Sequence, residues 1–200
     1  MYAEDIKDLV QILSRMPGLG PRSGRRLALQ LLKKRDTLLR PLNRALHQAD
    51  MNIQTCTTCG YLDTINPCSL CVDPKRDPSI LCVLADVADV WAFERTQSYN
   101  GLYHILGGLL SASDGVGIDQ LNIKKLIERL NNNPPSELII GLSATMEGQT
   151  TLDYLQQLIK RDVSHTIHIT TLAHGVPVGG EIDYLDDNTL HTALKERRAV

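Results

Sequence analysis

Four cysteines have the spacing of a metal site. Cys56 and Cys59 form one C-x-x-C pair, and Cys68 and Cys71 form a second pair after eight intervening residues. Each pair can place two thiolates on one tetrahedral ion, and Gly60 supplies a turn of the kind that such a knuckle needs. We expect one structural zinc per chain, because four thiolates leave no coordination position open for chemistry.

Two other uses of these cysteines stay open on the sequence alone. A redox C-x-x-C pair or a disulfide framework would use the same residue type, although an intracellular chain disfavours disulfides and redox chemistry needs no second matching pair. The fifth cysteine, Cys82, lies in the apolar run of residues 80–84. We expect Cys82 to be a buried core thiol.

A second candidate site lies in the stretch MPGLGPRSGRRLALQLL, residues 16–32. Gly18 and Gly20 allow a tight turn and the close approach of a ligand, and the proline that follows suits the first turn of a helix. Arg22, Arg25 and Arg26 stand at the head of that helix, with the first and third four residues apart on one face. Free N–H groups at a helix N-terminus, flanked by guanidinium groups, make a phosphate site.

The phosphate carrier that fits this stretch is a DNA backbone. A mononucleotide P-loop needs a buried strand before it and a Lys-Ser or Lys-Thr pair after its glycines, and neither is present here. A helix-hairpin-helix grips the backbone without base contacts and therefore without sequence preference. A plain helical hairpin with surface arginines remains the alternative.

Apolar spacing predicts the elements that position these residues. Helical spacing is found on both sides of the glycine turn, at Ile6, Leu9, Val10 and Leu13 and again at Leu27, Leu31 and Leu32. Beyond the cysteines, strands are expected at 80–84, 103–106, 138–140 and 167–169, with helices from Val87 through Val90, Trp91 and Glu94, at 119–130 and at 150–160. This alternation indicates a parallel sheet that is covered on both faces and binds ligands beyond the carboxyl ends of its strands.

Composition and charge limit the class of protein. The 200 residues are 42% hydrophobic and 22% charged, which suits a folded core, and no apolar run is long enough to cross a membrane. Residues 1–50 hold ten Lys/Arg against five Asp/Glu, whereas residues 51–200 hold eleven against eighteen. A basic N-terminal module on an acidic body favours a nucleic-acid partner. The acidic start does not fit a signal peptide, so we expect a cytoplasmic protein.

Several long strings in this order resemble the RecR family of bacterial recombination mediators. They are LSRMPGLGPRSGRRLA, the two cysteine pairs, FERTQSYNGLYHILGGLLS, TMEGQTT and AHGVPVGGEIDYLD. The resemblance covers the whole chain and implies an α+β multi-module fold. Its parts are a helix-hairpin-helix at 1–53, a C4 zinc finger at 54–75, an α/β Toprim domain with a parallel sheet at 79–174, and a C-terminal tail with a helix and an interface segment at 175–200.

The same resemblance implies a function. The chain would be a non-enzymatic DNA-binding clamp that forms a homotetrameric ring and binds DNA irrespective of sequence. It would act in recombinational DNA repair with RecO and RecF, helping to load recombinase at single-strand gaps on the bacterial nucleoid.

A metal-dependent Toprim nuclease or primase-like enzyme is the alternative function. Such enzymes hold magnesium with a glutamate after the first strand and an Asp-x-Asp pair after a later one. Here Ala85 stands at the glutamate position and Ser143-Ala144-Thr145 at the second, where RecR proteins generally keep the glutamate and have Asn-Pro-Thr. The emptied carboxylate set disfavours the enzyme. A zinc-containing interaction protein without DNA contact is a third possibility, which the basic N-terminal module disfavours.

The carboxylates that remain near this edge have two interpretations. The resemblance implies that Asp89 and Glu147 form an acidic face for a basic RecO surface, whereas helix capping or ordinary surface charge is the alternative for both and for Asp86. His104, His168 and His174 have no nucleophile at a recognisable spacing, so we expect strand or loop histidines without chemistry. The glycine-rich stretch 174–180 is expected to order a subunit interface.

Overall fold

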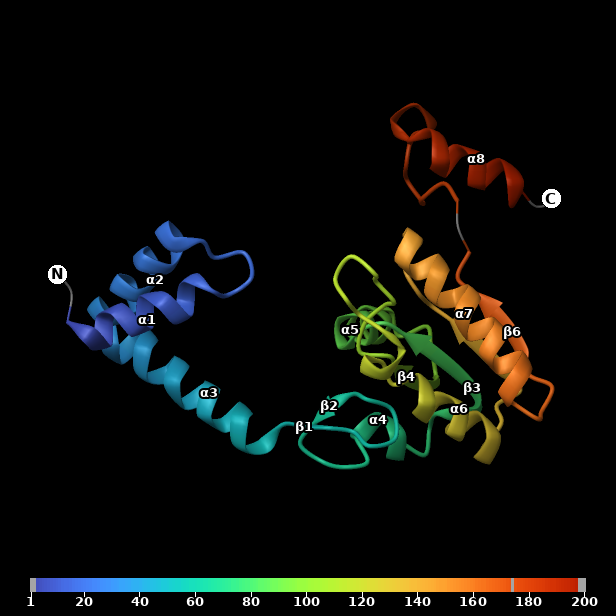
Figure 1. The fold of residues 1–200 in the computed structure, drawn as a ribbon, viewed down its shortest axis with the longest axis horizontal. Helices are drawn as coiled ribbons and strands as arrows, with labels where there is room; N and C mark the ends of the chain where they lie inside the picture. The colour runs from blue at the N-terminus through green and yellow to red at the C-terminus, as the bar shows by residue number, and fades with distance from the viewer. Residues whose placement is uncertain (1–2, 174, 198–200) are drawn as a thin grey trace. The chain divides into compact units, whose positions relative to one another are not determined.

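The computed structural model describes residues 3–173 and 175–197, in two compact units that divide between Ile53 and Gln54 (Figure 1). His174 lies outside the described residues. The first unit holds α1 (Glu4–Ser14), α2 (Pro21–Lys33), a π-helical turn (Arg35–Leu39) and α3 (Arg40–Asn52). The second holds β1 (Gln54–Thr55), β2 (Leu62–Asp63), α4 (Ser69–Val72), β3 (Asp77–Leu84), α5 (Val87–Thr96), β4 (Gly101–Ile105), α6 (Ile123–Asn132), β5 (Glu137–Ile140), α7 (Met146–Asp162), β6 (His168–Thr171) and α8 (Asp187–Lys195), with 3-10 turns at Ile118–Gln120 and Ile182–Tyr184.

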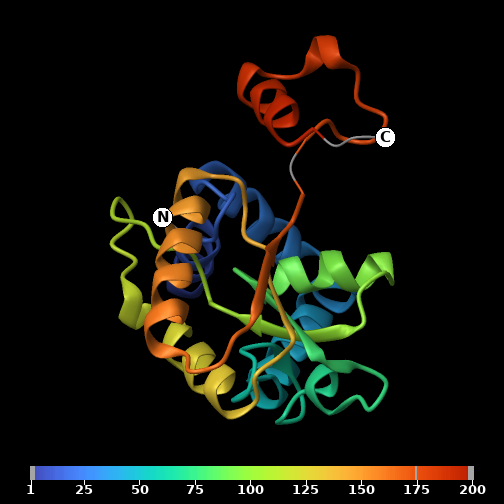
Figure 2. The ribbon, with the colours of Figure 1, turned by 90° about the vertical axis from the view of Figure 1, so that its right-hand side faces the viewer.

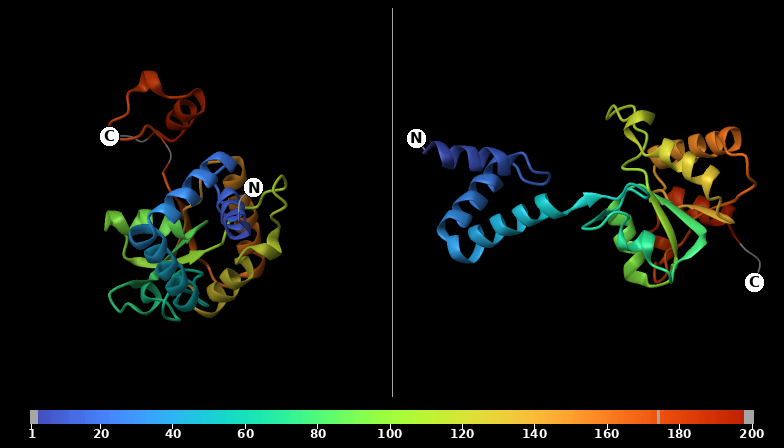
Figure 3. Two further views of the ribbon diagram at one scale, coloured as in Figure 1. Left: turned by 90° about the vertical axis from the view of Figure 1, so that its left-hand side faces the viewer. Right: turned by 90° about the horizontal axis from the view of Figure 1, so that it is seen from below.

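In the first unit, α1 and α2 pack side by side as a hairpin, which Figure 3 shows from two further sides. The small core between them is made by Leu13, Ala28 and Leu31, with Leu9 and Val10 half-buried against it. The expected pair of helices is confirmed, since apolar residues three and four apart meet on one face of each helix. α3 follows the hairpin and has no buried residue.

The second unit is built on a parallel sheet in the order β4-β3-β5-β6. Leu84 of β3 is in register with Ile105 of β4, and Val83 of β3 with Ile140 of β5. All of these strands therefore end at one edge, where an α/β sheet binds its ligands. The expected alternation of strands and helices is confirmed.

Helices cover both faces of this sheet. Leu81 and Val83 face a core that includes residues of α6 and α7, whereas the alternate residues Cys82 and Leu84 face a second core with Val90 of α5. Figure 2 shows α7 and α5 on opposite sides of the strands. Such two-sided burial explains why β3 is a continuous apolar run rather than an alternating one.

Two helices begin at other positions than the periodicity predicts. α7 begins at Met146 and not near residue 150, because Thr145 caps it by accepting a hydrogen bond from the Gly148 amide at 3.1 Å. α6 begins at Ile123, after a separate 3-10 turn at Ile118–Gln120. Within the described ranges, no helix has the length and apolar character needed to cross a bilayer.

Candidate nucleic-acid interface and metal centre

The turn between α1 and α2 is open on its outer side. Gly18 has a positive φ of 77°, and a Cβ built at Gly18 or Gly20 would meet nothing within 4 Å. Gly20 is the N-cap of α2 and offers no side-chain acceptor to the helix, and Pro21 has no amide hydrogen. The amides of Arg22 and Ser23 are thus left without an acceptor in the helix itself, as is general for a first turn. The backbone can approach an anion closely here.

The three predicted arginines surround this open turn. Arg22, Arg25 and Arg26 are all exposed, while Ala28 and Leu31 of the same helix are buried against α1. Among the residues that the structure describes, none of the three arginines has an ion-pair partner. Their guanidinium groups, together with the positive end of the α2 dipole, form a positive surface for a phosphate.

Gly24 is a further residue of the hairpin that the sequence analysis missed. A Cβ at this buried position would lie 2.4 Å from Ser14 Oγ and 2.8 Å from the Ser14 amide nitrogen. Gly24 therefore lets α1 and α2 approach closely, which sets the angle at which the arginines are presented. The signal was a glycine inside a helical apolar pattern, where glycine costs helix stability and needs a packing reason.

The four cysteine sulfurs converge on one point. All four lie within 4.8 Å of one another, with Cys59 Sγ 3.5 Å from Cys68 Sγ and Cys56 Sγ 4.0 Å from Cys71 Sγ. A tetrahedral ion with bonds of about 2.3 Å to sulfur needs sulfurs roughly 3.8 Å apart. The donor set and its spacing therefore fit a zinc ion, and none of the cysteines is in a disulfide.

Backbone amides support the sulfur cluster. The Tyr61 amide donates to Cys59 Sγ at 3.4 Å and the Cys68 amide to Cys56 Sγ at 3.3 Å, so the backbone offers hydrogen bonds that favour thiolates. Gly60, at a φ of 83°, makes the first knuckle's turn. The hydrogen bond between the Cys59 and Cys68 sulfurs raises the pKa of Cys59 and lowers the pKa of Cys68. A bound metal must displace such protons, so its affinity depends on pH.

The first cysteine knuckle packs against the carboxyl end of β4. The Ile105 amide donates to the Cys59 carbonyl at 2.7 Å. A Cβ at Gly60 would lie 2.9 Å from the Ile105 carbonyl oxygen, so only glycine allows this approach. Tyr61 and Leu70 contact both the cysteine cluster and the core beneath α5. The cysteine cluster and its knuckle are therefore part of the support of the sheet.

At the end of β3 the carboxylates cap a helix. The Asp86 side chain accepts from the Ala88 amide, and Asp89 Oδ2 accepts from the Asp86 amide, each at 2.9 Å, which forms a capping box at the start of α5. Ala85, at the position where Toprim enzymes have glutamate, is half-buried and packs on the apolar core. Asp89 therefore stabilises the start of α5.

At the end of β5 the polar groups are hydroxyls. Ser143 Oγ lies 3.2 Å from Thr145 Oγ1, and Glu147 is exposed in the first turn of α7. A Cβ at Gly148 would lie 1.9 Å from the Ser143 carbonyl oxygen, because the loop crosses the start of the helix at this glycine. In the described part of the chain, the four cysteines are the one group of three or more metal-ligand side chains that comes together. At this edge of the sheet, no three carboxylates of the described residues come together.

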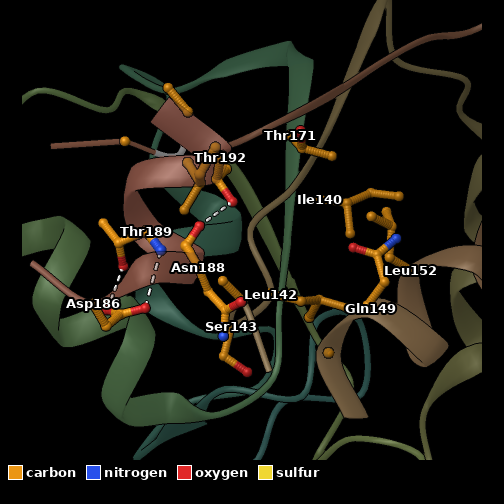
Figure 4. Close-up of a pocket in the computed structure, with 15 residues that line it drawn as sticks. Ile140, Leu142, Ser143, Gln149, Leu152, Thr171, Asp186, Asn188, Thr189 and Thr192 are labelled. Atoms are coloured by element: carbon orange, nitrogen blue, oxygen red, sulfur yellow. Dashed lines mark hydrogen bonds between the residues drawn. The ribbon is translucent and has the colours of Figure 1, made fainter. Parts of the chain in front are cut away.

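A cavity of about 700 Å³ opens beside this edge, and Figure 4 shows its lining. α7, β5 and β6 contribute Gln149, Ile140 and Thr171 on one side, and α8 contributes Asn188 and Thr192 on the other. Asp186, its one carboxylate, accepts from the Thr189 amide at 3.0 Å and thereby caps α8. The described lining contains no Lys, Arg or His. It therefore has neither the cations of a phosphate site nor the free carboxylates of a magnesium site.

Three side chains singled out in the sequence have other environments. Burial raises the pKa of the Cys82 thiol to about 12, so this core thiol stays protonated and apart from the four ligands. Burial lowers the pKa of His104 to about 4, and its Nε2 donates to the Asn122 carbonyl at 3.0 Å. Trp91 was expected among apolar positions of its helix but is 60% exposed. The apolar spacing did not predict this exposure, because it treats the apolar residues of α5 alike, whereas only Val90 is buried.

Known protein families match most of the chain. A model described as RecR, helix-hairpin-helix matches residues 6–50, one described as Toprim domain matches 79–173, and one described as RecR, C-terminal matches 175–198. The recombination protein RecR of Rhodopseudomonas palustris strain HaA2 is 53% identical over 193 residues, which cover 96% of this chain and 94% of the relative. The same protein of Bradyrhizobium sp. strain ORS 278 is 52% identical, with 96% of each chain covered. That of Bartonella henselae is 51% identical, with 96% and 94% covered.

Proposed function

Since the chain belongs to the RecR family of recombination proteins, we propose that it is a non-enzymatic DNA-binding clamp of recombinational DNA repair. The observation that carries this proposal is the open start of α2, where Gly18 and Gly20 expose the backbone and three arginines have no ion-pair partner among the described residues. Phosphate contacts of this kind hold DNA without reading its sequence. A role at gaps of any sequence requires this kind of grip.

The sheet edge supports a function without catalysis. Phosphodiester chemistry in Toprim enzymes depends on carboxylates that hold a metal ion against the reacting phosphate. Ala85 packs into the core, Ser143 and Thr145 offer neutral hydroxyls, and Asp86 and Asp89 cap α5. These groups give a hard cation few of the charged oxygen ligands that it prefers.

We assign the cysteine cluster one structural zinc per chain. The four thiolates would fill a tetrahedral shell, and the Cys59 carbonyl and Gly60 would transmit the resulting rigidity to β4. The metal would then act on folding and not on chemistry. On this basis we propose modules at 1–53, 54–75, 79–174 and 175–200.

The partners that we propose are RecO and RecF, with which the chain would help to load recombinase at single-strand gaps on the nucleoid, in the cytoplasm. Glu147 is exposed at the start of α7 and is therefore available to a basic surface of RecO. Asp89 is half-buried in its capping box, so it would contribute mainly through its charge.

We also propose that the chain assembles into a tetrameric ring. α3 supports self-association, because its apolar side chains Leu42 and Leu46 lie one helical turn apart and are 40% and 58% exposed, and Ile53, which follows the helix, is 43% exposed. The C-terminal tail likewise exposes Val178 and Tyr184. Such unburied apolar groups are typical of surfaces that another chain covers.

The experiment for the DNA grip is the double variant Arg22→Ala/Arg26→Ala. We expect binding to weaken about equally on unrelated sequences, and the slope of log affinity against log salt to fall by about one per lost phosphate contact. The control is Lys160→Ala/Arg161→Ala in the last turn of α7, which removes the same charge outside the hairpin. A folded hairpin variant with wild-type affinity and salt slope would contradict the proposed interface.

A further inference from the structure

We propose that Trp91 and Tyr61 form an aromatic platform on which an unpaired DNA base stacks, with Arg95 beside it for the adjoining phosphate. This site lies wholly within the second unit, where Trp91 of α5 meets Tyr61 beside the cysteine cluster. It rests on the proposed function, because it requires that the chain bind DNA. It extends that function by naming the form of DNA, a single strand, that this surface recognises.

The indole of Trp91 is both exposed and held in place. Trp91 is the only tryptophan of the chain, and its side chain is 60% exposed. Its Nε1 donates a hydrogen bond to the Tyr61 hydroxyl oxygen at 3.0 Å. A ring that is fixed by its edge keeps its π-faces available, and stacking on it costs little side-chain freedom.

Tyr61 is anchored by the metal centre. Its amide donates to Cys59 Sγ, and its carbonyl accepts from the Cys56 amide at 2.7 Å. Its ring packs both on the cysteine cluster and on the core beneath α5. The partner that orients Trp91 is therefore part of a rigid knuckle and not of a mobile loop.

The charges around Trp91 favour a nucleic acid. Arg95 lies one turn further along α5, on the face of Trp91, and has no ion-pair partner in the described part of the chain. Glu94 is occupied, because it accepts from Arg76 and from the Tyr103 hydroxyl. Asp89 lies two residues away on another face and is held in the capping box. Arg95 is therefore the charged side chain that shares the face of Trp91, and it can bind a phosphate there.

Small neighbours leave room for a base. Ala88, one turn before Trp91, and Ala92, next to it, are both exposed and carry only a methyl group. A flat base can therefore approach the ring, and stacking on an aromatic side chain tolerates every base because each has a π-face. A duplex has its bases stacked on one another, so we expect the platform to distinguish single strands from duplexes.

Fluorescence of the single tryptophan tests the proposal directly. We expect a thymidine oligonucleotide of about 20 nucleotides to quench the emission of the full-length, zinc-loaded protein, and a duplex of equal length to quench it much less. Trp91→Ala should weaken single-strand binding, measured by anisotropy of a labelled oligonucleotide, about fivefold to a hundredfold and leave duplex binding unchanged. Trp91→Phe, which keeps an aromatic ring, should restore part of the affinity.

Two further variants separate stacking from a general loss of fold. Tyr61→Phe removes only the hydroxyl that orients the indole, so we expect a smaller loss than for Trp91→Ala. Arg95→Ala should lower the slope of log affinity against log salt by about one. The matched control is Arg161→Ala, which removes an exposed arginine from α7 and should change neither quenching nor single-strand affinity.

The outcomes distinguish this proposal from the proposed function. If the wild-type chain binds no DNA, both are overturned. If it binds duplex through the hairpin arginines but shows no quenching, and Trp91→Ala binds single strands as well as wild type, the platform alone is overturned. If Trp91→Ala leaves single-strand affinity intact but weakens binding of RecO or of a second copy of the chain, this face is a protein interface and base stacking is overturned.

Discussion

The burial of His104 on β4 connects one side chain to the pH dependence of stability. Its side chain is 1% exposed, Nε2 donates to the Asn122 carbonyl, and Nδ1 has no partner among the described residues. A charged imidazole is poorly solvated in this place, and the pKa therefore falls from the ordinary 6.5 to about 4. In the folded chain the ring is neutral at pH 7.

His104 should therefore make folding weaken in mild acid. Between the folded pKa of about 4 and the ordinary value of 6.5, the unfolded chain binds more protons, so its contribution is full above pH 6.5 and is lost as the pH falls toward 4. We expect wild type to lose about 2 kcal/mol more unfolding free energy than His104→Gln between about pH 7 and about pH 5. Urea unfolding at the two pH values measures this.

The control for this prediction is His168→Gln on β6, the same substitution at an exposed histidine. The glutamine at 104 keeps an amide that can donate to Asn122. Parallel stability curves for wild type and His104→Gln would show that the buried ring does not govern the acid response.

At the scale of elements, the cysteine cluster is joined to β4 by a backbone hydrogen bond and by shared packing. The Ile105 amide bonds to the Cys59 carbonyl, and Tyr61 packs under α5 while accepting from Trp91. Strands of two residues, such as β1 and β2, are too short to be stable alone. We therefore expect the finger to depend on the proposed zinc, and the adjoining end of β4 to depend on the finger.

Removing the metal should lower stability and release Trp91 together. We expect chelation to lower Tm by about 10 °C or more. At about 2–4 °C per kcal/mol for a chain of this size, this is a loss of roughly 2.5–5 kcal/mol of unfolding free energy. The tryptophan emission should shift to the red at temperatures well below Tm, because Tyr61 loses its anchor. Differential scanning calorimetry and emission spectra, with and without chelator, measure the two effects.

Metal content separates the ligands from the core thiol. Cys59→Ser should contain almost no zinc, whereas Cys82→Ala should keep about one per chain, because Cys82 lies in the core between β3 and α5. A metal-free protein with the Tm of the metal-loaded one would refute the structural role.

At the scale of the whole molecule, the exposed apolar residues of α3 bear on assembly. The helix has no buried residue, and the side chain of Leu46 is 58% exposed although a leucine side chain gains free energy when it is buried. The chain as a monomer leaves this stripe in water. A second copy that covers it would remove apolar area from solvent at both subunits.

Mass in solution should show the assembly and its dependence on α3. We expect light scattering to give four times the mass of one chain, and Leu46→Glu to give a smaller species, because a carboxylate cannot be buried in an apolar interface without a partner. Gln48→Glu adds the same charge two residues along the helix and should leave the mass unchanged. A monomeric wild type, with or without gapped duplex DNA, would contradict the ring.

The sequence by itself determined what depends on neighbours along the chain. Cys56 and Cys59 predict a metal knuckle because two thiolates at this spacing can reach one ion. Glycines 18 and 20 followed by Pro21 predict a turn into a helix, and apolar spacing predicted the order of strands and helices around the parallel sheet. The signals of these features lie within a few residues of one another, where backbone geometry alone sets which groups meet.

The tertiary structure decided what depends on contacts between distant residues. Only the packing of α1 on α2 shows that Gly24 lies against Ser14, and only the sheet shows that Ile105 bonds to Cys59. The exposure of Trp91 depends on which face of α5 the sheet covers. The sequence of α5 does not specify that face, because Val90, Trp91 and Phe93 point in different directions around the helix. Such choices are made by long-range packing, because an isolated helix or strand gains little free energy from burying one face until its partner is in place.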